Sequence, residues 1–415
     1  MRDTSFSICK ALAIILVVLS HSGAPGWVND FIFQFHVPVF FICAGYFFHT
    51  RYLNDEKTYV LHRVEGLYFP FLRWSIIFLI LHNLFFPLGI LSEQYGNAAG
   101  GVLHPYTWQV FNQRLWSIVF NMSGYDEFIG GTFWFFRALL LSSVAFLLLF
   151  KVLRKYRPDN SDAQVAWTIT GIALGMALWK VTCNLKITGV AQGGYREIMG
   201  VFFMAAGFLF RQYRERIPMN IWLATACLAV TVIGACYFPS SMTWSANFKQ
   251  FVSLLLPSLA GFGVLYYLSC RLDTGVRFLK AGLVYIGDRT LYIFAFHLLA
   301  FKVVSAMKVG YYGLPWQEVG GHPVVNAHAD DWFFLLYLLA GVGLPLLWLS
   351  VYRHLAKRID FSLKSRALWL LNVLFLLMRF IFLGLKTVIK ALWNTLLGII
   401  TGIKDIINAS NPNDE

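Results

Sequence analysis

Long apolar blocks separated by short polar segments are the main pattern along this chain. A helix that crosses the hydrocarbon core of a bilayer needs about 20 mainly apolar residues, and ten blocks approach or exceed that length. Pro and Gly interrupt several blocks, which neighbouring helices can tolerate. The pattern predicts ten spanning helices, at about residues 6–22, 31–49, 68–91, 132–150, 164–180, 197–210, 220–238, 250–270, 282–307 and 332–352.

Two segments fall outside this pattern. Residues 92–131 are rich in Tyr, Trp, Asn and Gly, so we expect a long loop that could stack on a sugar ring or form a folded lid. We assign residues 1–365 to one transmembrane domain and residues 366–415 to a membrane-associated tail. In the tail, residues 386–408 alternate lysines with apolar residues, which favours an amphipathic helix on the inner leaflet. The competing interpretation is an eleventh span over residues 367–385.

Composition strengthens the membrane interpretation. The chain of 415 residues is 58% apolar and only 13% charged, about half the charged share of an ordinary soluble domain. One soluble core could not bury so much apolar surface, and a disordered chain would contain far less of it. The sequence therefore predicts an all-α fold, a polytopic integral membrane helical bundle.

The distribution of cations predicts the orientation of this bundle. The chain has 34 Lys and Arg against 21 Asp and Glu, a net charge of +13. Membrane proteins concentrate Lys and Arg in cytoplasmic loops, and no basic stripe interleaved with aromatic residues suggests nucleic acid. If the N-terminus is cytoplasmic, every inside loop has at least three such residues and only one outside loop does. We therefore expect both termini in the cytoplasm.

Motifs for several common chemistries are missing from the sequence. The six Cys residues show no C-x-x-C spacing, so we interpret them as small buried hydrophobic residues. No G-x-S-x-G elbow, phosphate-binding glycine loop or dinucleotide fingerprint occurs. The candidate histidines are too few for a zinc site, and we expect no bound metal.

Ionisable residues inside spanning helices are costly and are therefore candidates for a site. Lys10 and His21 lie eleven residues apart in the first helix, about three turns, which places them on one face with roughly 16 Å between them along the axis. Lys10 could instead be an anchor that reaches the membrane surface, and His21 a hydrogen-bonded interface histidine. On the predicted topology, Lys10 lies near the inner surface and His21 near the outer one.

Further candidates lie near these two levels. His36, at the entry of the second helix, is expected near the outer surface beside His21, where a histidine pair could perform acid–base chemistry. Trp134 and Arg137 begin the fourth helix at the same level, and His297 lies within the ninth. At the inner level, Arg63 and Arg289 could join Lys10 in holding an anion.

Several segments together resemble the acyltransferase-3 family of membrane-bound O-acyltransferases. They are residues 7–13 (SICKALA), the His21-Ser22 ending, residues 35–46 (FHVPVFFICAGY), Arg63 to Pro70, residues 133–135 (FWF) and residues 287–293 (GDRTLYI) followed by His297. The resemblance covers about residues 5–350. The segment with His36, Pro38 and Gly45 is most similar to the branch that acetylates sugars, such as fucose 4-O-acetylases.

The resemblance implies transfer of an acyl group, usually acetyl from acetyl-CoA, to a hydroxyl of an envelope or exopolysaccharide sugar. It implies that His21 is catalytic and that Lys10 and Arg63 contact the donor. The family usually has arginine at the position of Lys10, and lysine lacks the two-pronged fork that arginine offers a phosphate. It also tends to carry an Arg-x-x-Arg pair, of which this chain has Arg63 but Gly66. We expect a bacterial inner-membrane protein.

The residues leave the mechanism open. His21 could act as a general base or as a nucleophile that forms an acyl-histidine. Asp30 and Asp126 are candidates for the carboxylate that orients it. A transporter of a small molecule or glycan precursor would also explain ten spans with buried charges, and a scaffold for envelope assembly is a third class. A weak similarity between residues 40–45 and 202–207 is what an inverted repeat, or chance, would produce.

Overall fold

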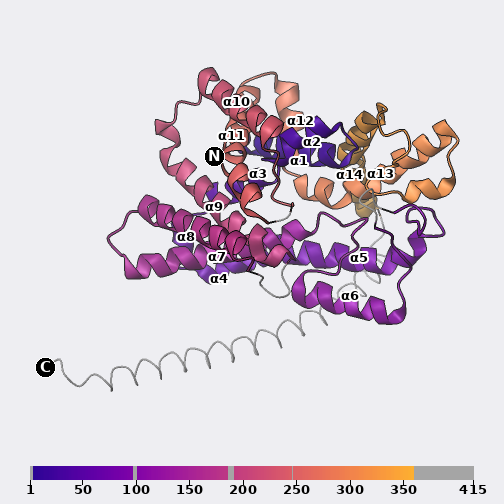
Figure 1. Ribbon diagram of the computed structural model, residues 1–415, viewed down its shortest axis with the longest axis horizontal. Helices are drawn as coiled ribbons and strands as arrows, with labels where there is room; N and C mark the ends of the chain where they lie inside the picture. The colour runs from indigo at the N-terminus through magenta and orange to yellow at the C-terminus, as the bar shows by residue number, and fades with distance from the viewer. Residues whose placement is uncertain (1–2, 97–100, 186–190, 245, 359–415) are drawn as a thin grey trace, which may run out of the picture. The chain divides into compact units, whose positions relative to one another are not determined.

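Helices that follow the apolar blocks of the sequence build the described chain (Figure 1). The computed structural model describes residues 3–96, 101–185, 191–244 and 246–358. Within these ranges there are α-helices and no strand. The α-helices are α1 Thr4–His21, α2 Gly26–Phe33, α3 Pro38–Tyr46, α4 Glu56–Arg63, α5 Phe69–Phe85, α6 Trp108–Asn121, α7 Trp134–Tyr156, α8 Asp162–Thr182, α9 Tyr195–Tyr213, α10 Ile221–Tyr237, α11 Phe248–Asp273, α12 Arg277–Gly287, α13 Thr290–Tyr312 and α14 Phe333–Arg358.

Each of the ten expected spans corresponds to helix in the structure. Eight helical segments in the described chain are long and apolar enough to cross a membrane. The other two expected spans correspond to α10, which is apolar but has 17 residues, and α9, whose sequence includes Arg196, Glu197 and Arg211. The chain is therefore an all-α polytopic membrane protein. The tail, residues 366–415, with its expected surface helix or eleventh span, lies outside the described residues.

Two of the expected spans are interrupted, and candidate residues lie at both interruptions. The expected span 31–49 lies within a helical segment that is interrupted inside it: α2 ends at Phe33, a turn follows, and α3 begins at Pro38. Proline has no N–H to donate to a preceding turn, so it suits the first position of a new helix. The expected helix 282–307 is also broken, into α12 and α13, with Asp288 and Arg289 between them.

The segment 92–131 is not simply a loop, because it contains α6. Thr107 accepts a hydrogen bond from the N–H of Val110 and so caps the first turn of this helix. At the far end of α6, the carbonyl of Val119 accepts a hydrogen bond from the hydroxyl of Tyr68 at 2.7 Å. Helix α6 therefore packs beside α5 and the residues just before it.

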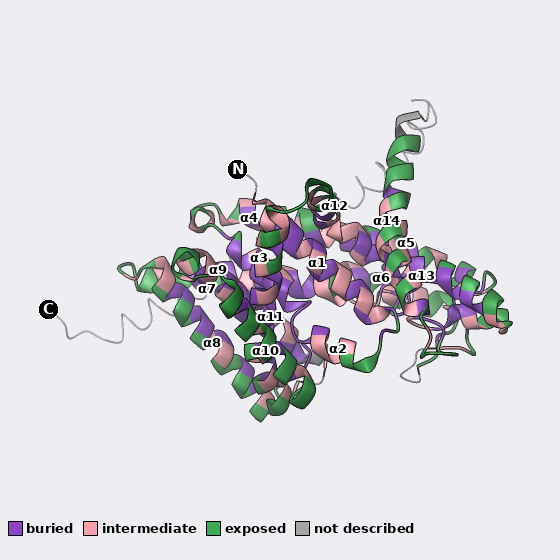
Figure 2. Ribbon diagram, turned by 90° about the horizontal axis from the view of Figure 1, so that it is seen from above, coloured by how far each residue is buried: buried purple, intermediate pink, exposed green. Residues whose placement is uncertain are grey.

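Helix α1 lies in the interior of the bundle. Ten of its eighteen residues are buried, and it packs against α3, α11, α12 and α13. The contact with α12 is very close, because a Cβ built on Gly287 would lie 1.8 Å from the carbonyl oxygen of Ser7. Figure 2 shows buried positions along α1 and α3, whereas α8 and α10 have many exposed positions. The helix that carries Lys10 and His21 is thus held by neighbours on several sides.

Helices α3 and α9 also approach closely, through one glycine from each. A Cβ on Gly45 would lie 1.9 Å from the carbonyl oxygen of Met204, and a Cβ on Gly207 would lie 1.9 Å from that of Ile42. Small residues at such contacts let membrane helices pack backbone to backbone. The similar segments 40–45 and 202–207 are therefore the two sides of one helix contact.

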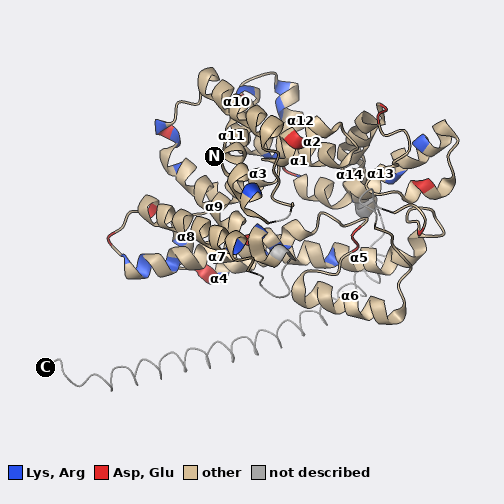
Figure 3. Ribbon diagram, in the orientation of Figure 1, with Lys and Arg blue, Asp and Glu red and all other residues tan. Residues whose placement is uncertain are grey.

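The chain divides into two compact units, residues 1–349 and 350–415. All the candidate site residues lie in the first unit. In Figure 3, long stretches of helix carry no charged residue, and Lys, Arg, Asp and Glu lie mainly near helix ends and in connections. Charged side chains within the bundle are therefore exceptions that need a structural or chemical explanation.

Candidate active site

A cavity of about 320 Å³ lies inside the first unit. Its walls come mainly from α1, α3, α7, the beginning of α13, and the end of α4 with the π-helical turn that follows it. Most of the lining side chains are apolar or aromatic, such as Val17, Phe40, Leu139 and Phe294. Ligand sites commonly combine such walls with a few polar groups that fix orientation.

Lys10 and His21 both line this cavity. Their spacing of eleven residues gives them a common face of α1, and the helical rise separates them by roughly 16 Å along its axis. Arg63 lines the cavity as well, and among the described residues no carboxylate lies at ion-pair distance from Lys10 or Arg63. The cavity therefore carries unneutralised positive charge together with a histidine.

The ring of His21 is oriented by its own helix. Its Nδ1 lies 2.8 Å from the carbonyl oxygen of Val17, one turn earlier. A carbonyl only accepts hydrogen bonds, so Nδ1 carries the proton and donates it. The neutral ring then keeps its lone pair on Nε2, which is the form that a general base needs.

His36 repeats this arrangement in the same cavity. It lies in the turn before α3, and its Nδ1 donates to the carbonyl oxygen of Ile32 at 2.6 Å. The side chain is buried and lines the same cavity as His21. The break between α2 and α3 thus places a second neutral histidine in the cavity.

His297 lies close to His21 but does not line the cavity. The two ring centres are 5.3 Å apart, and His297 has no exposed surface. Its Nδ1 donates to the carbonyl oxygens of Ile293 and Phe294, and its Nε2 has no hydrogen-bond partner among the described residues. His297 therefore stands behind His21 as a second buried imidazole.

The remaining sequence candidates divide between the cavity wall and its surroundings. Trp134 lines the cavity, and the guanidinium of Arg196 lies 4.2 Å from the centre of its ring. Arg137 does not line it, because its guanidinium faces the carboxylate of Glu197, with Nε and Oε1 3.5 Å apart and both side chains largely buried.

Arg289 is also absent from the cavity wall. Its guanidinium lies 3.7 Å from the ring centre of Tyr285 and donates to the carbonyl oxygen of the same residue at 3.1 Å. Of the three expected cations, the structure therefore brings Lys10 and Arg63 to the cavity and leaves Arg289 outside its lining.

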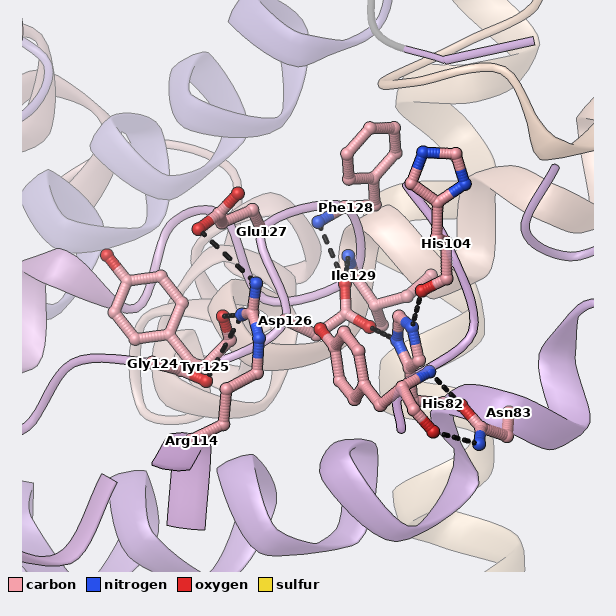
Figure 4. A network of polar contacts seen from close by, with 11 residues as sticks. His82, Asn83, His104, Arg114, Gly124, Tyr125, Asp126, Glu127, Phe128 and Ile129 are labelled. Atoms are coloured by element: carbon pink, nitrogen blue, oxygen red, sulfur yellow. Dashed lines mark hydrogen bonds and ion pairs between the residues drawn. The ribbon is translucent and has the colours of Figure 1, made fainter. Parts of the chain in front are cut away.

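Asp126, a candidate for orienting His21, binds another histidine (Figure 4). Its Oδ2 lies 2.6 Å from Nδ1 of His82, and neither side chain is exposed. Nε2 of His82 lies 3.0 Å from the carbonyl oxygen of His104. Both ring nitrogens of His82 therefore face acceptors, and the contact with Asp126 is fully buried.

The contact between His82 and Asp126 holds the segment before α7 against α5. The other carboxylate oxygen of Asp126 accepts the N–H groups of Phe128 and Ile129, and the ring of Tyr106 stacks on His82. Sequence reasoning missed this pair because its members are 44 residues apart and no motif links them. Asp30, the other carboxylate that we considered for orienting His21, lies on α2. The group that hydrogen-bonds to Nδ1 of His21 is instead the backbone carbonyl of Val17.

Metal-binding side chains do not gather in the described parts of the chain. No group of three or more His, Cys, Asp or Glu side chains there is arranged to hold a metal ion.

The fold and cavity define a polytopic helical membrane protein with a histidine- and cation-lined chamber inside its bundle. A family model described as an acyltransferase domain, Acyl_transf_3, matches residues 3–348. Because this match covers most of the chain, the protein belongs to the acyltransferase-3 family and is a membrane acyltransferase. Comparisons with curated proteins and with solved structures found no match.

Proposed function

We propose that this protein transfers an acetyl group from acetyl-CoA to a hydroxyl of a cell-envelope or exopolysaccharide sugar, across a bacterial inner membrane. The observation that carries this proposal is the composition of one cavity. Lys10 and Arg63 supply positive charge to its wall, and His21 and His36 supply neutral imidazoles. An anionic donor and a reaction that needs a base both suit this combination.

His21 is the proposed catalytic base. Its Nε2 takes the proton from the acceptor hydroxyl while the oxygen attacks the thioester carbonyl carbon. The C–O bond forms, the C–S bond breaks, and the CoA thiolate takes the proton back from His21. In the covalent variant, Nε2 attacks the thioester carbonyl first, the C–S bond breaks and CoA leaves as the thiolate. The acceptor hydroxyl then attacks the acyl-histidine, the C–N bond breaks, and the hydroxyl proton passes to the CoA thiolate.

Lys10 and Arg63 are the proposed contacts for the donor phosphates. The apolar stretch of cavity between the cations and His21 suits the pantetheine arm, which carries no charge and ends in the thioester. Arg289 takes no part in this scheme, because it is outside the cavity lining.

The acceptor is proposed to bind at the His21 end. The ring of Trp134 offers an apolar face to a sugar, and His36 offers a hydrogen-bonding group in the same wall. Arg137 and His297 do not reach this wall and act as supports behind it. The predicted topology places this end at the outer surface.

Sealed membrane vesicles of known orientation test this function. Acetyl-CoA is supplied to one face at a time, and labelled acetyl is followed into envelope glycans by mass spectrometry. We expect transfer only when the donor reaches the cytoplasmic face and the sugar lies on the other side. Transfer that requires acetyl-CoA at the outer face would contradict both the topology and the mechanism.

A further inference from the structure

A second cavity, of about 500 Å³, adjoins the Lys10 end of α1. It is lined by Asp3, Ser7 and Lys10 from the start of the chain, by Tyr46, Phe47 and His49 around the end of α3, and by Arg211 of α9. Lys10 and Phe47 line this cavity and the first one. The acyl-transfer scheme above uses only the first cavity and gives the second no role.

Positive charge exceeds negative charge around this second cavity. Arg211 and Lys10 face it, and no carboxylate in the described chain lies at ion-pair distance from either. Its one acidic residue, Asp3, is already engaged by Nη1 of Arg214 at 3.4 Å and by the hydroxyl of Tyr46 at 3.5 Å. The lining therefore suits an anion.

Arg211 is anchored in a way that leaves donors available. Its Nη1 donates to the carbonyl oxygens of Tyr46, at 3.1 Å, and of Phe48, and lies 3.4 Å from Nδ1 of His49. These contacts cap the end of α3 and fix the guanidinium at the cavity. All the hydrogen bonds described for Arg211 use Nη1, whereas a guanidinium has five N–H donors and suits phosphate geometry.

We propose that this second cavity binds the phosphate-bearing nucleotide end of the acyl-CoA donor, with Arg211 as its principal anion contact and Lys10 between the two cavities. This inference rests on the proposed function. At about 320 Å³, the first cavity is near the lower end of the range for ligand sites and is mainly apolar, so it suits the acyl-pantetheine arm and the phosphate next to it, at Lys10 and Arg63, but not the rest of the nucleotide. The nucleotide end then needs an adjoining cationic space, which the second cavity provides.

Donor binding by the purified full-length protein in lipid nanodiscs tests this subsite. Calorimetry compares CoA with pantetheine, which lacks every phosphate, for the wild type and for Arg211→Gln. A charge-assisted contact to phosphate contributes enough that its loss weakens CoA binding roughly 10- to 100-fold. Pantetheine affinity should remain the same in both proteins, and Arg211→Lys, which keeps the charge, should lose less than Arg211→Gln.

Arg216 provides a matched control, because it lies just beyond the same end of α9, faces the ring of Tyr213 and does not line the cavity. We expect Arg216→Gln to leave CoA affinity unchanged. Equal losses of CoA affinity in the two glutamine variants, or equal losses for CoA and pantetheine, would overturn the subsite. A wild-type protein that binds no CoA would instead overturn the donor assignment in the proposed function. Thermal unfolding of each variant shows whether a loss of CoA affinity reflects misfolding. If Arg211→Gln is misfolded, the CoA affinity of Arg211→Lys tests the subsite in its place.

Discussion

His21 and His297 form a pair of imidazoles whose ring centres are 5.3 Å apart. Each ring donates from Nδ1 to a carbonyl one turn earlier in its own helix, Val17 for His21 and Ile293 for His297. Each neutral ring therefore has its lone pair on Nε2. With this tautomer, Nε2 is the atom at which His21 can accept a proton from a substrate.

Replacing His21 tests its chemical role. We expect His21→Ala to reduce acyl transfer about 10²–10⁴-fold, the usual contribution of a positioned acid–base group. The thermal midpoint should change little, because His21 bonds only to its own helix turn and its neighbour Ser20. The measurement is labelled-acetyl transfer together with thermal unfolding. His104→Ala, at an exposed histidine outside the cavity, is the control. Full activity in a folded His21→Ala protein would contradict the assignment.

Replacing Lys10 separates binding from chemistry. We expect Lys10→Ala to raise the KM for acetyl-CoA about tenfold and to leave kcat nearly unchanged, because a phosphate contact stabilises the bound donor and the transition state equally. Lys10→Arg should be tolerated or should bind more tightly, since arginine offers a two-pronged fork. Steady-state kinetics with varied donor measures both quantities. A change confined to kcat at saturating donor would show that Lys10 is not a phosphate anchor.

Adding a methyl group at Gly45 tests the contact between α3 and α9. The Cβ of Gly45→Ala would lie 1.9 Å from a backbone oxygen of α9, so the helices must separate. We expect a loss of about 1–3 kcal/mol of stability or more, the usual cost of overpacking. Gly171→Ala on α8 is the control, because nothing lies within 4 Å of its Cβ and alanine favours helix. Thermal unfolding in detergent compares the two, and equal midpoints would refute this account of the contact.

His322 lies in the connection between α13 and α14, and we expect it to make the stability of the protein depend on pH. Burial, Lys302 and His21 lower the pKa of His322 to about 3, below its ordinary value of 6.5. Between these values the unfolded chain binds a proton that the folded chain excludes, so this residue reduces stability as pH falls from 6.5 toward 3. His322→Gln should flatten that part of the stability profile and change little above pH 7. An unchanged slope in the variant would show that His322 is readily protonated in the folded protein.

The amino-acid sequence by itself determines the fold class of this protein. Blocks of about 20 apolar residues have few alternatives to spanning helices, because lipid satisfies no backbone hydrogen bond. The helical repeat likewise determined that Lys10 and His21 share a face of α1, since this relation lies within one helix. Both follow from local chemistry, which a sequence records directly.

Tertiary structure decided which distant side chains meet. Helix packing decides three relationships in this protein. It pairs His82 with Asp126, and it sets His297 behind His21. It also brings Arg63, but not Arg289, to the cavity wall. Such contacts join residues that are tens or hundreds of positions apart and follow no period in the sequence. Close approaches at Gly45, Gly207 and Gly287 fix how the helices pack, because only a missing side chain allows the backbones to touch.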